Sequence, residues 1–152
     1  MFLTVHATSG IIIGQYFTNP IVAFIMGYLS HFVLDIIPHG DDKLFIHYLW
    51  PKRLKALITT AAIDSVLAIV WLILIFVHTD TIYSTAILTA IIGTVLPDFL
   101  LGLYQVKKIK VIKWNYDLSI LAHSFLKEKR PSIFWGFFIQ IIFFIALIIY
   151  LL

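Results

Sequence analysis

Cysteine is absent from this 152-residue chain, and charged residues make up only 12% of it. The lack of cysteine excludes disulfides and thiolate metal sites. The scarcity of charge, with 61% apolar residues, departs from soluble domains, which carry about 25% charged residues. In water, a chain of this composition would expose large apolar patches. We therefore expect the protein to lie in a lipid bilayer.

Other familiar signals are missing as well. Residues 1–17 contain neither a basic start nor a small-residue cleavage site, so no secretory signal is expected. The sequence has no Walker loop, Rossmann fingerprint or Gly-x-Ser-x-Gly element. Its net charge of +3 arises from basic residues placed as membrane flanks, so we expect membrane lipids as partners and no nucleic acid.

Long apolar runs dominate what is present. Four of them, residues 20–37, 56–77, 82–104 and 132–152, are long enough to be considered as membrane spans. A shorter apolar segment, residues 2–17, is either a short span or a re-entrant helix. Because backbone groups cannot stay unpaired in lipid, all five segments are expected to be helical. The predicted fold is all-α, a single-domain polytopic membrane bundle of about four to five transmembrane helices over residues 1–152. Gly10, Gly14 and Gly27 are expected where helices pack closely.

The basic residues predict the topology. All eleven Lys and Arg fall in two segments, residues 43–55 and 107–130, and none lies in the loop of residues 78–81. The positive-inside rule places both basic segments in the cytoplasm, in an inner membrane of bacterial or archaeal type. Residues 115–126 are expected to form a short amphipathic helix at the cytoplasmic interface, and residues 40–50 are a second candidate for such a helix.

Ionisable side chains lie inside the apolar runs, where each is costly and therefore suggests a function. His31 and Asp35 are four residues apart and share one face of a helix, and His39 follows just beyond Pro38. An imidazole and a carboxylate on one face can share a divalent cation.

Depth in the membrane is consistent with one shared site. With the predicted topology, seven candidate residues from five segments fall in the same, cytoplasmic half of the bilayer: His6, His31, Asp35, His39, Asp64, Asp98 and His123. By contrast, His78 is expected to be an interfacial residue without a role in the site.

Several short motifs resemble a known family. They are Thr4-Val-His6-Ala-Thr-Ser-Gly10, Gly27-Tyr-Leu-Ser-His31-Phe-Val-Leu-Asp35-Ile-Ile-Pro-His39, Gly93-Thr-Val-Leu-Pro97-Asp98 and Ala122-His123-Ser124. Together they are similar to the YdjM-like family of membrane-bound, predicted metal-dependent hydrolases. The His-x-x-x-Asp spacing also distantly resembles zinc-dependent phospholipase C. The chain departs from the family after Asp98, where Phe-Leu-Leu stands in place of a further Asp and His.

The residues and the resemblance together lead to a metal-dependent hydrolase that acts on a phospholipid or another phosphoester. The expected metal is Zn²⁺, although Mn²⁺ or Fe²⁺ would accept the same groups. Asp64, or a carboxylate shared with the metal, is the expected general base, and His123 is a ligand or proton donor. The expected metal ligands are His6, His31, Asp35, His39 and Asp98.

Two alternatives use the same residues. The buried His and Asp side chains could instead form a relay in a transporter or channel for a metal ion or protons. They could also only lock the helices of a structural membrane protein.

Overall fold

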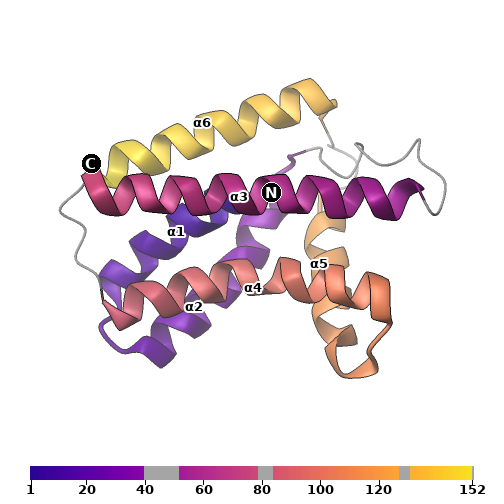
Figure 1. The fold of residues 1–152 in the computed structure, drawn as a ribbon, viewed down its shortest axis with the longest axis horizontal. Coiled ribbons are helices and arrows are strands. Elements are labelled where there is room, and N and C mark those ends of the chain that lie inside the picture. The colour runs from indigo at the N-terminus through magenta and orange to yellow at the C-terminus, as the bar shows by residue number, and fades with distance from the viewer. Residues whose placement is uncertain (40–51, 79–83, 127–130, 152) are drawn as a thin grey trace.

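The computed structural model describes residues 1–39, 52–78, 84–126 and 131–151 (Figure 1). Within these ranges the chain is helical and contains no strand. The elements are α1 (Leu3–Tyr16), α2 (Pro20–Ile36), α3 (Lys52–His78), α4 (Thr85–Lys107), the 3₁₀ turn η2 (Lys110–Ile112), α5 (Lys113–Ser124) and α6 (Ile133–Leu151).

The all-α prediction is confirmed, and each apolar segment forms one helix. The segment of residues 2–17 forms α1, and the four longer runs form α2, α3, α4 and α6. The helix expected at residues 115–126 is present as α5, two residues earlier in the chain. The second amphipathic candidate, residues 40–50, lies outside the described residues.

Helix length distinguishes two groups of helices. Among the described residues, α3, α4 and α6 are long and apolar enough to cross a membrane. At about 1.5 Å per residue, the 14 residues of α1 and the 17 residues of α2 measure only ~21 and ~26 Å. A hydrocarbon core is about 30 Å thick, so α1 and α2 are short for a complete crossing. Three candidate spans are therefore present by length and composition.

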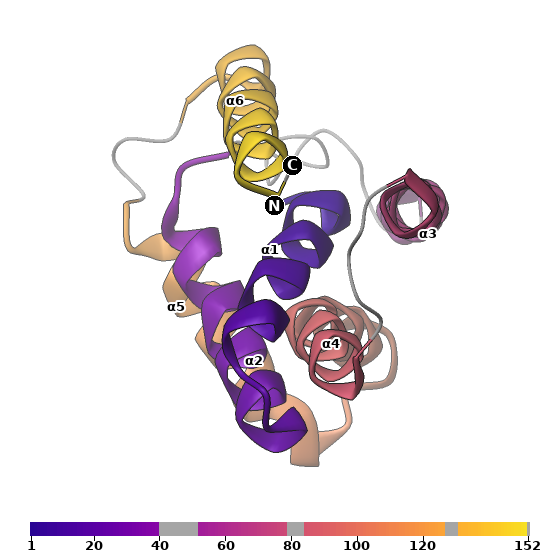
Figure 2. The same cartoon turned by 90° about the vertical axis from the view of Figure 1, so that its left-hand side faces the viewer.

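The short helices occupy the interior of the bundle. In Figure 1, α3, α4 and α6 follow the long axis, whereas α1 and α2 form a hairpin whose open end lies near the middle of that axis. Helix α5 runs across the bundle beyond this open end. Figure 2 shows α1 at the centre, between α2, α3, α4 and α6. In agreement, nine of the 14 residues of α1 are buried.

Glycines permit the close approach of α1 and α2 to α4. A Cβ atom added at Gly14 would lie 2.3 Å from the Cα atom of Ile87, and one at Gly27 would lie 2.4 Å from the carbonyl oxygen of Ala90. A Cβ atom added at Gly10 would lie 2.7 Å from the Cα atom of Ile91. The three predicted close-packing positions are confirmed, since only a residue without a side chain fits at these backbone contacts.

Large apolar side chains cover the outside of the long helices. Leu67 and Ile73 of α3 and Phe137 of α6 are all more than half exposed. Side chains of this kind suit a surface that faces lipid rather than water.

Candidate metal centre

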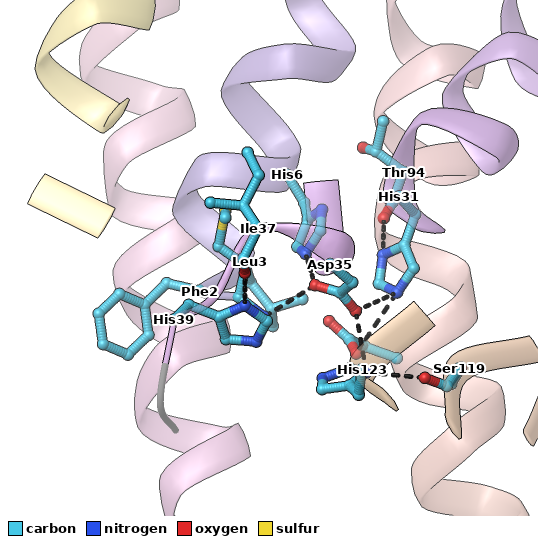
Figure 3. A network of polar contacts seen from close by, with 12 residues as sticks. Phe2, Leu3, His6, His31, Asp35, Ile37, His39, Thr94, Ser119 and His123 are labelled. Carbon is cyan, nitrogen blue, oxygen red and sulfur yellow. Dashed lines mark hydrogen bonds and ion pairs between the residues drawn. The ribbon is translucent and has the colours of Figure 1, made fainter. Parts of the chain in front are cut away.

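Six of the seven predicted site residues meet where the open end of the α1–α2 hairpin faces α4 and α5. His6 lies in the second turn of α1, His31 and Asp35 in the last turns of α2, and His39 just beyond that helix. Asp98 comes from α4, and His123 lies at the end of α5. The convergence expected from helix depth is therefore present in the tertiary structure (Figure 3).

Asp35 is the centre of this cluster. Its Oδ1 atom lies 3.3 Å from His6 Nε2 and 2.9 Å from the amino nitrogen of Met1. Its Oδ2 atom lies 3.2 Å from His31 Nε2 and 3.8 Å from His123 Nδ1. The Asp35 side chain is fully buried, so these neighbours replace the water that an ionised carboxylate would otherwise have.

His31 is fixed in an orientation that suits a metal ligand. Its Nδ1–H donates to the carbonyl oxygen of Thr94 at 2.8 Å, which leaves the lone pair on Nε2. That Nε2 atom faces both Asp35 and Asp98, whose Oδ1 atom is 3.8 Å away. The ring stacks on His6, with the ring centroids 4.2 Å apart. Metal-bound histidines are commonly held in this way through the nitrogen that does not face the metal.

His39 and His123 are also held through Nδ1. His39 Nδ1 donates to the carbonyl oxygen of Ile37 at 2.6 Å, and His39 Nε2 lies 2.9 Å from the Met1 amino nitrogen. His123 Nδ1 donates to the carbonyl oxygen of Ser119 at 2.8 Å. The two rings meet edge to face, 5.2 Å between centroids.

Several buried atoms of the cluster lack a hydrogen-bond partner. They are both ring nitrogens of His6, the Nε2 atom of His31 and the Oδ2 atom of Asp35. The Nε2 atoms of His6 and His31 lie 3.3 and 3.2 Å from the oxygens of Asp35, but not in hydrogen-bonding geometry. Buried polar atoms are nearly always paired, because an unpaired one loses its hydration without compensation. A divalent cation would satisfy nitrogen and carboxylate lone pairs of this kind, so the residues fit a metal.

The donor atoms form two sets. In the first, ligand atoms of His6, His31 and Asp98 all lie within 4.8 Å of one another. In the second, the same is true of Asp35, His39 and His123. Imidazole nitrogen with carboxylate oxygen is a donor set that suits Zn²⁺ and is also accepted by Mn²⁺ and Fe²⁺.

Asp64 is in neither of these sets, and its carboxylate lies at the start of α1. Its Oδ2 atom accepts a hydrogen bond from the backbone N–H of Leu3 at 2.9 Å. The first N–H groups of a helix have no partner within the helix, and the residue before α1, Phe2, supplies no side-chain cap. A carboxylate from α3 therefore takes the place of a local cap and suits the positive end of the helix dipole.

Two further buried polar residues belong to the surroundings of the cluster. Gln140 of α6 accepts from Phe2 N–H at 2.8 Å and donates to the carbonyl oxygen of His39 at 3.2 Å. Asn115 of α5 donates to the carbonyl oxygen of Pro97 at 2.9 Å. Gln140 could have been found from the sequence, since it is the single amide in a long uncharged apolar run. Asn115 could not have been singled out in this way, because it lies in a segment with many other polar residues.

Burial differs among the described members of the cluster. The side chains of His6, His31 and Asp35 are fully buried, whereas those of Asp98 and His123 are 27% and 25% exposed. The partly exposed members of the cluster therefore come from α4 and α5. Nearby on α5, Lys113 pairs with Asp117 at 2.6 Å on the exposed face, and this hydrogen bond raises the pKa of Lys113.

No family model, curated protein or solved structure matches this chain. The resemblance to the YdjM-like family stays a prediction, and the interpretation of the site rests on its own geometry.

Proposed function

We propose that this protein is a membrane-embedded, metal-dependent hydrolase of the YdjM-like kind, acting on a phospholipid or another phosphoester at the cytoplasmic leaflet. The observation that carries the proposal is the buried His–Asp cluster, in which both ring nitrogens of His6, the Nε2 atom of His31 and the Oδ2 atom of Asp35 have no hydrogen bond.

A purely structural role explains this arrangement poorly. A cluster that only locked helices would be expected to pair its polar atoms, as Gln140 and Asn115 do. Instead, His31 Nε2 and Asp35 Oδ2 face each other at 3.2 Å without a hydrogen bond, and both ring nitrogens of His6 are unpaired, whereas the Nδ1 atoms of His31, His39 and His123 are satisfied by backbone carbonyls. Histidines held to the backbone through Nδ1, with Nε2 turned toward a carboxylate as in His31, are typical of a ligand shell.

A bound divalent cation would supply polarisation of a phosphoryl oxygen and a water whose pKa is lowered to about 7. Asp98 is the carboxylate on the exposed side of the site and is the group that takes up the proton of the attacking water. The water oxygen attacks phosphorus, the ester P–O bond breaks, and the leaving oxygen receives the proton from Asp98. Asp64 is not required as the base, because its carboxylate is engaged at the start of α1.

The basic residues near α5 support an anionic substrate. Lys107, Lys108, Lys110 and Lys113 are exposed along the end of α4 and the start of α5, the two helices that carry the partly exposed members of the cluster. Exposed cations of this kind attract anionic lipid head groups, each by about 1 kcal/mol near a membrane surface.

Metal analysis of the purified protein is the first test. The full chain in detergent should retain zinc, and His31→Ala and Asp35→Asn should each lose it. His78→Ala and Asp117→Asn are matched controls, since both residues are exposed and outside the cluster, and they should keep the zinc. Equal zinc in all four variants would contradict the proposal.

Activity is the second test. In mixed micelles, the zinc-loaded protein should hydrolyse labelled phosphatidic acid or phosphatidylglycerol phosphate, and Asp35→Asn should not. The same preparation in liposomes tests the transporter alternative. Zinc flux without hydrolysis would refute the hydrolase and favour transport.

A further inference from the structure

The cluster holds more donors than a single catalytic cation uses. A catalytic zinc typically takes about three protein ligands and keeps a further position for water. Here four imidazoles and two carboxylates converge: His6, His31, His39, His123, Asp35 and Asp98.

The distances divide these donors between two positions. His6, His31 and Asp98 form one compact set, and Asp35, His39 and His123 form the other. Each set alone supplies the number of ligands that one catalytic cation requires.

Asp35 connects the two sets. Its Oδ1 atom faces His6 at 3.3 Å and its Oδ2 atom faces His31 at 3.2 Å, so both oxygens reach the first set. The same carboxylate belongs to the second set, in which ligand atoms of Asp35, His39 and His123 all lie within 4.8 Å of one another. A carboxylate that lies beside donors of both sets is suited to bridge two cations.

A positive group already lies beside the second set. The Met1 amino nitrogen is 2.9 Å from both Asp35 Oδ1 and His39 Nε2. These two acceptors therefore stabilise a cation at this point, and an ammonium group and a divalent cation would compete for them.

We propose that the cluster binds two divalent cations, one at His6, His31 and Asp98 and one at His39 and His123, with Asp35 bridging them. This deepens the proposed function and rests on it only in assuming that the cluster binds metal. Two such cations in one site, commonly about 3.5–4 Å apart, hold the attacking and leaving oxygens of a phosphoryl group.

The charge of such a centre points to a substrate class. A single divalent cation is balanced by the two carboxylates, Asp35 and Asp98, whereas a second leaves two positive charges unbalanced. A phosphomonoester carries about 1.5–2 negative charges at pH 7, which matches this excess. The favoured substrate is therefore a phosphomonoester rather than a neutral carboxylic ester.

The test counts cations and measures their coupling without relying on activity. The full chain in detergent is loaded with Mn²⁺, freed of excess metal, and examined by elemental analysis and electron paramagnetic resonance. We expect two Mn²⁺ per chain and a spin-coupled spectrum, because the cations share a carboxylate. Asp98→Asn and His123→Gln should each retain one Mn²⁺ and show the hyperfine pattern of an isolated ion. Asp117→Asn, the matched control, should retain two coupled ions.

One Mn²⁺ per unaltered chain, or two uncoupled ions, would overturn the proposal. Asp98 and His123 belong to different sets and are partly exposed, so if one variant fails to fold by circular dichroism, the other still decides. Two coupled ions without hydrolysis of phosphatidic acid would refute the hydrolase and keep the two-cation centre. Hydrolysis by a protein that binds a single ion would support the hydrolase and refute the two-cation centre.

Discussion

The Gly14→Ala variant tests whether the close contact between α1 and α4 holds the site together. The added Cβ atom would lie 2.3 Å from Ile87 Cα and 2.8 Å from Ile87 N. Ordinary contact begins at 3.4 Å, so the helices must separate by at least 1.1 Å, the difference between 3.4 and 2.3 Å. Both opposing atoms are backbone, so no side-chain rotation relieves the overlap.

The Gly14→Ala substitution should destabilise the protein as overpacking destabilises other protein cores. Forcing an extra carbon into a packed interface costs about 1–3 kcal/mol. Gly102 of α4 provides the matched control, since a Cβ atom there meets nothing within 4 Å. In a helix, Gly102→Ala should stabilise by about 0.5–1 kcal/mol, because alanine loses less conformational entropy than glycine.

The stability of both variants is measured by unfolding with sodium dodecyl sulfate in mixed micelles. Gly14→Ala should unfold at a lower detergent fraction than the unaltered protein, and Gly102→Ala at an equal or higher one. Zinc affinity should fall in Gly14→Ala alone, because His6 lies on α1 and Asp98 on α4. If the two variants unfold at the same detergent fraction, the packing argument is wrong.

Three further predictions concern the surroundings of the site. Gln140→Leu removes the hydrogen bonds to Phe2 and His39 and should weaken zinc binding about 10-fold at unchanged helicity; unaltered affinity would refute a positioning role. Asp64→Asn removes the charge at the start of α1 and should cost about 0.3–1 kcal/mol of stability with zinc retained. Loss of hydrolysis at full stability would instead restore Asp64 as the general base. Zinc at 100 times its Kd should stabilise the protein by about 2.7 kcal/mol, and chelation should abolish this gain but leave Asp35→Asn unaffected.

Much of the fold is encoded locally. Each apolar run became one helix, because backbone groups need helical hydrogen bonds wherever the surroundings offer no water. The His31–Asp35 pair was equally local, since residues four apart share a helix face at any position in a fold.

Asp64 shows where such reasoning stops. Depth along a helix placed Asp64 in the same half of the bilayer as His31, but depth does not specify which way each face of α3 points. In the structure the Asp64 carboxylate meets Leu3 N–H, and Asp98 rather than Asp64 lies beside His31. Rotation about a helix axis is set by packing against its neighbours, which the sequence of a single helix does not contain.

The lack of cysteine and the scarcity of charge by themselves indicated an apolar membrane protein, in which the ligands of any bound metal would be histidine and carboxylate. Only the tertiary structure decided that six of the candidate residues, Asp35 among them, meet in two adjoining sets, and that Asp64 is in neither set. The physical reason is that helix formation depends on neighbours in the chain, whereas a shared site depends on how α1, α2, α4 and α5 pack together, which the close contacts at Gly14 and Gly27 permit.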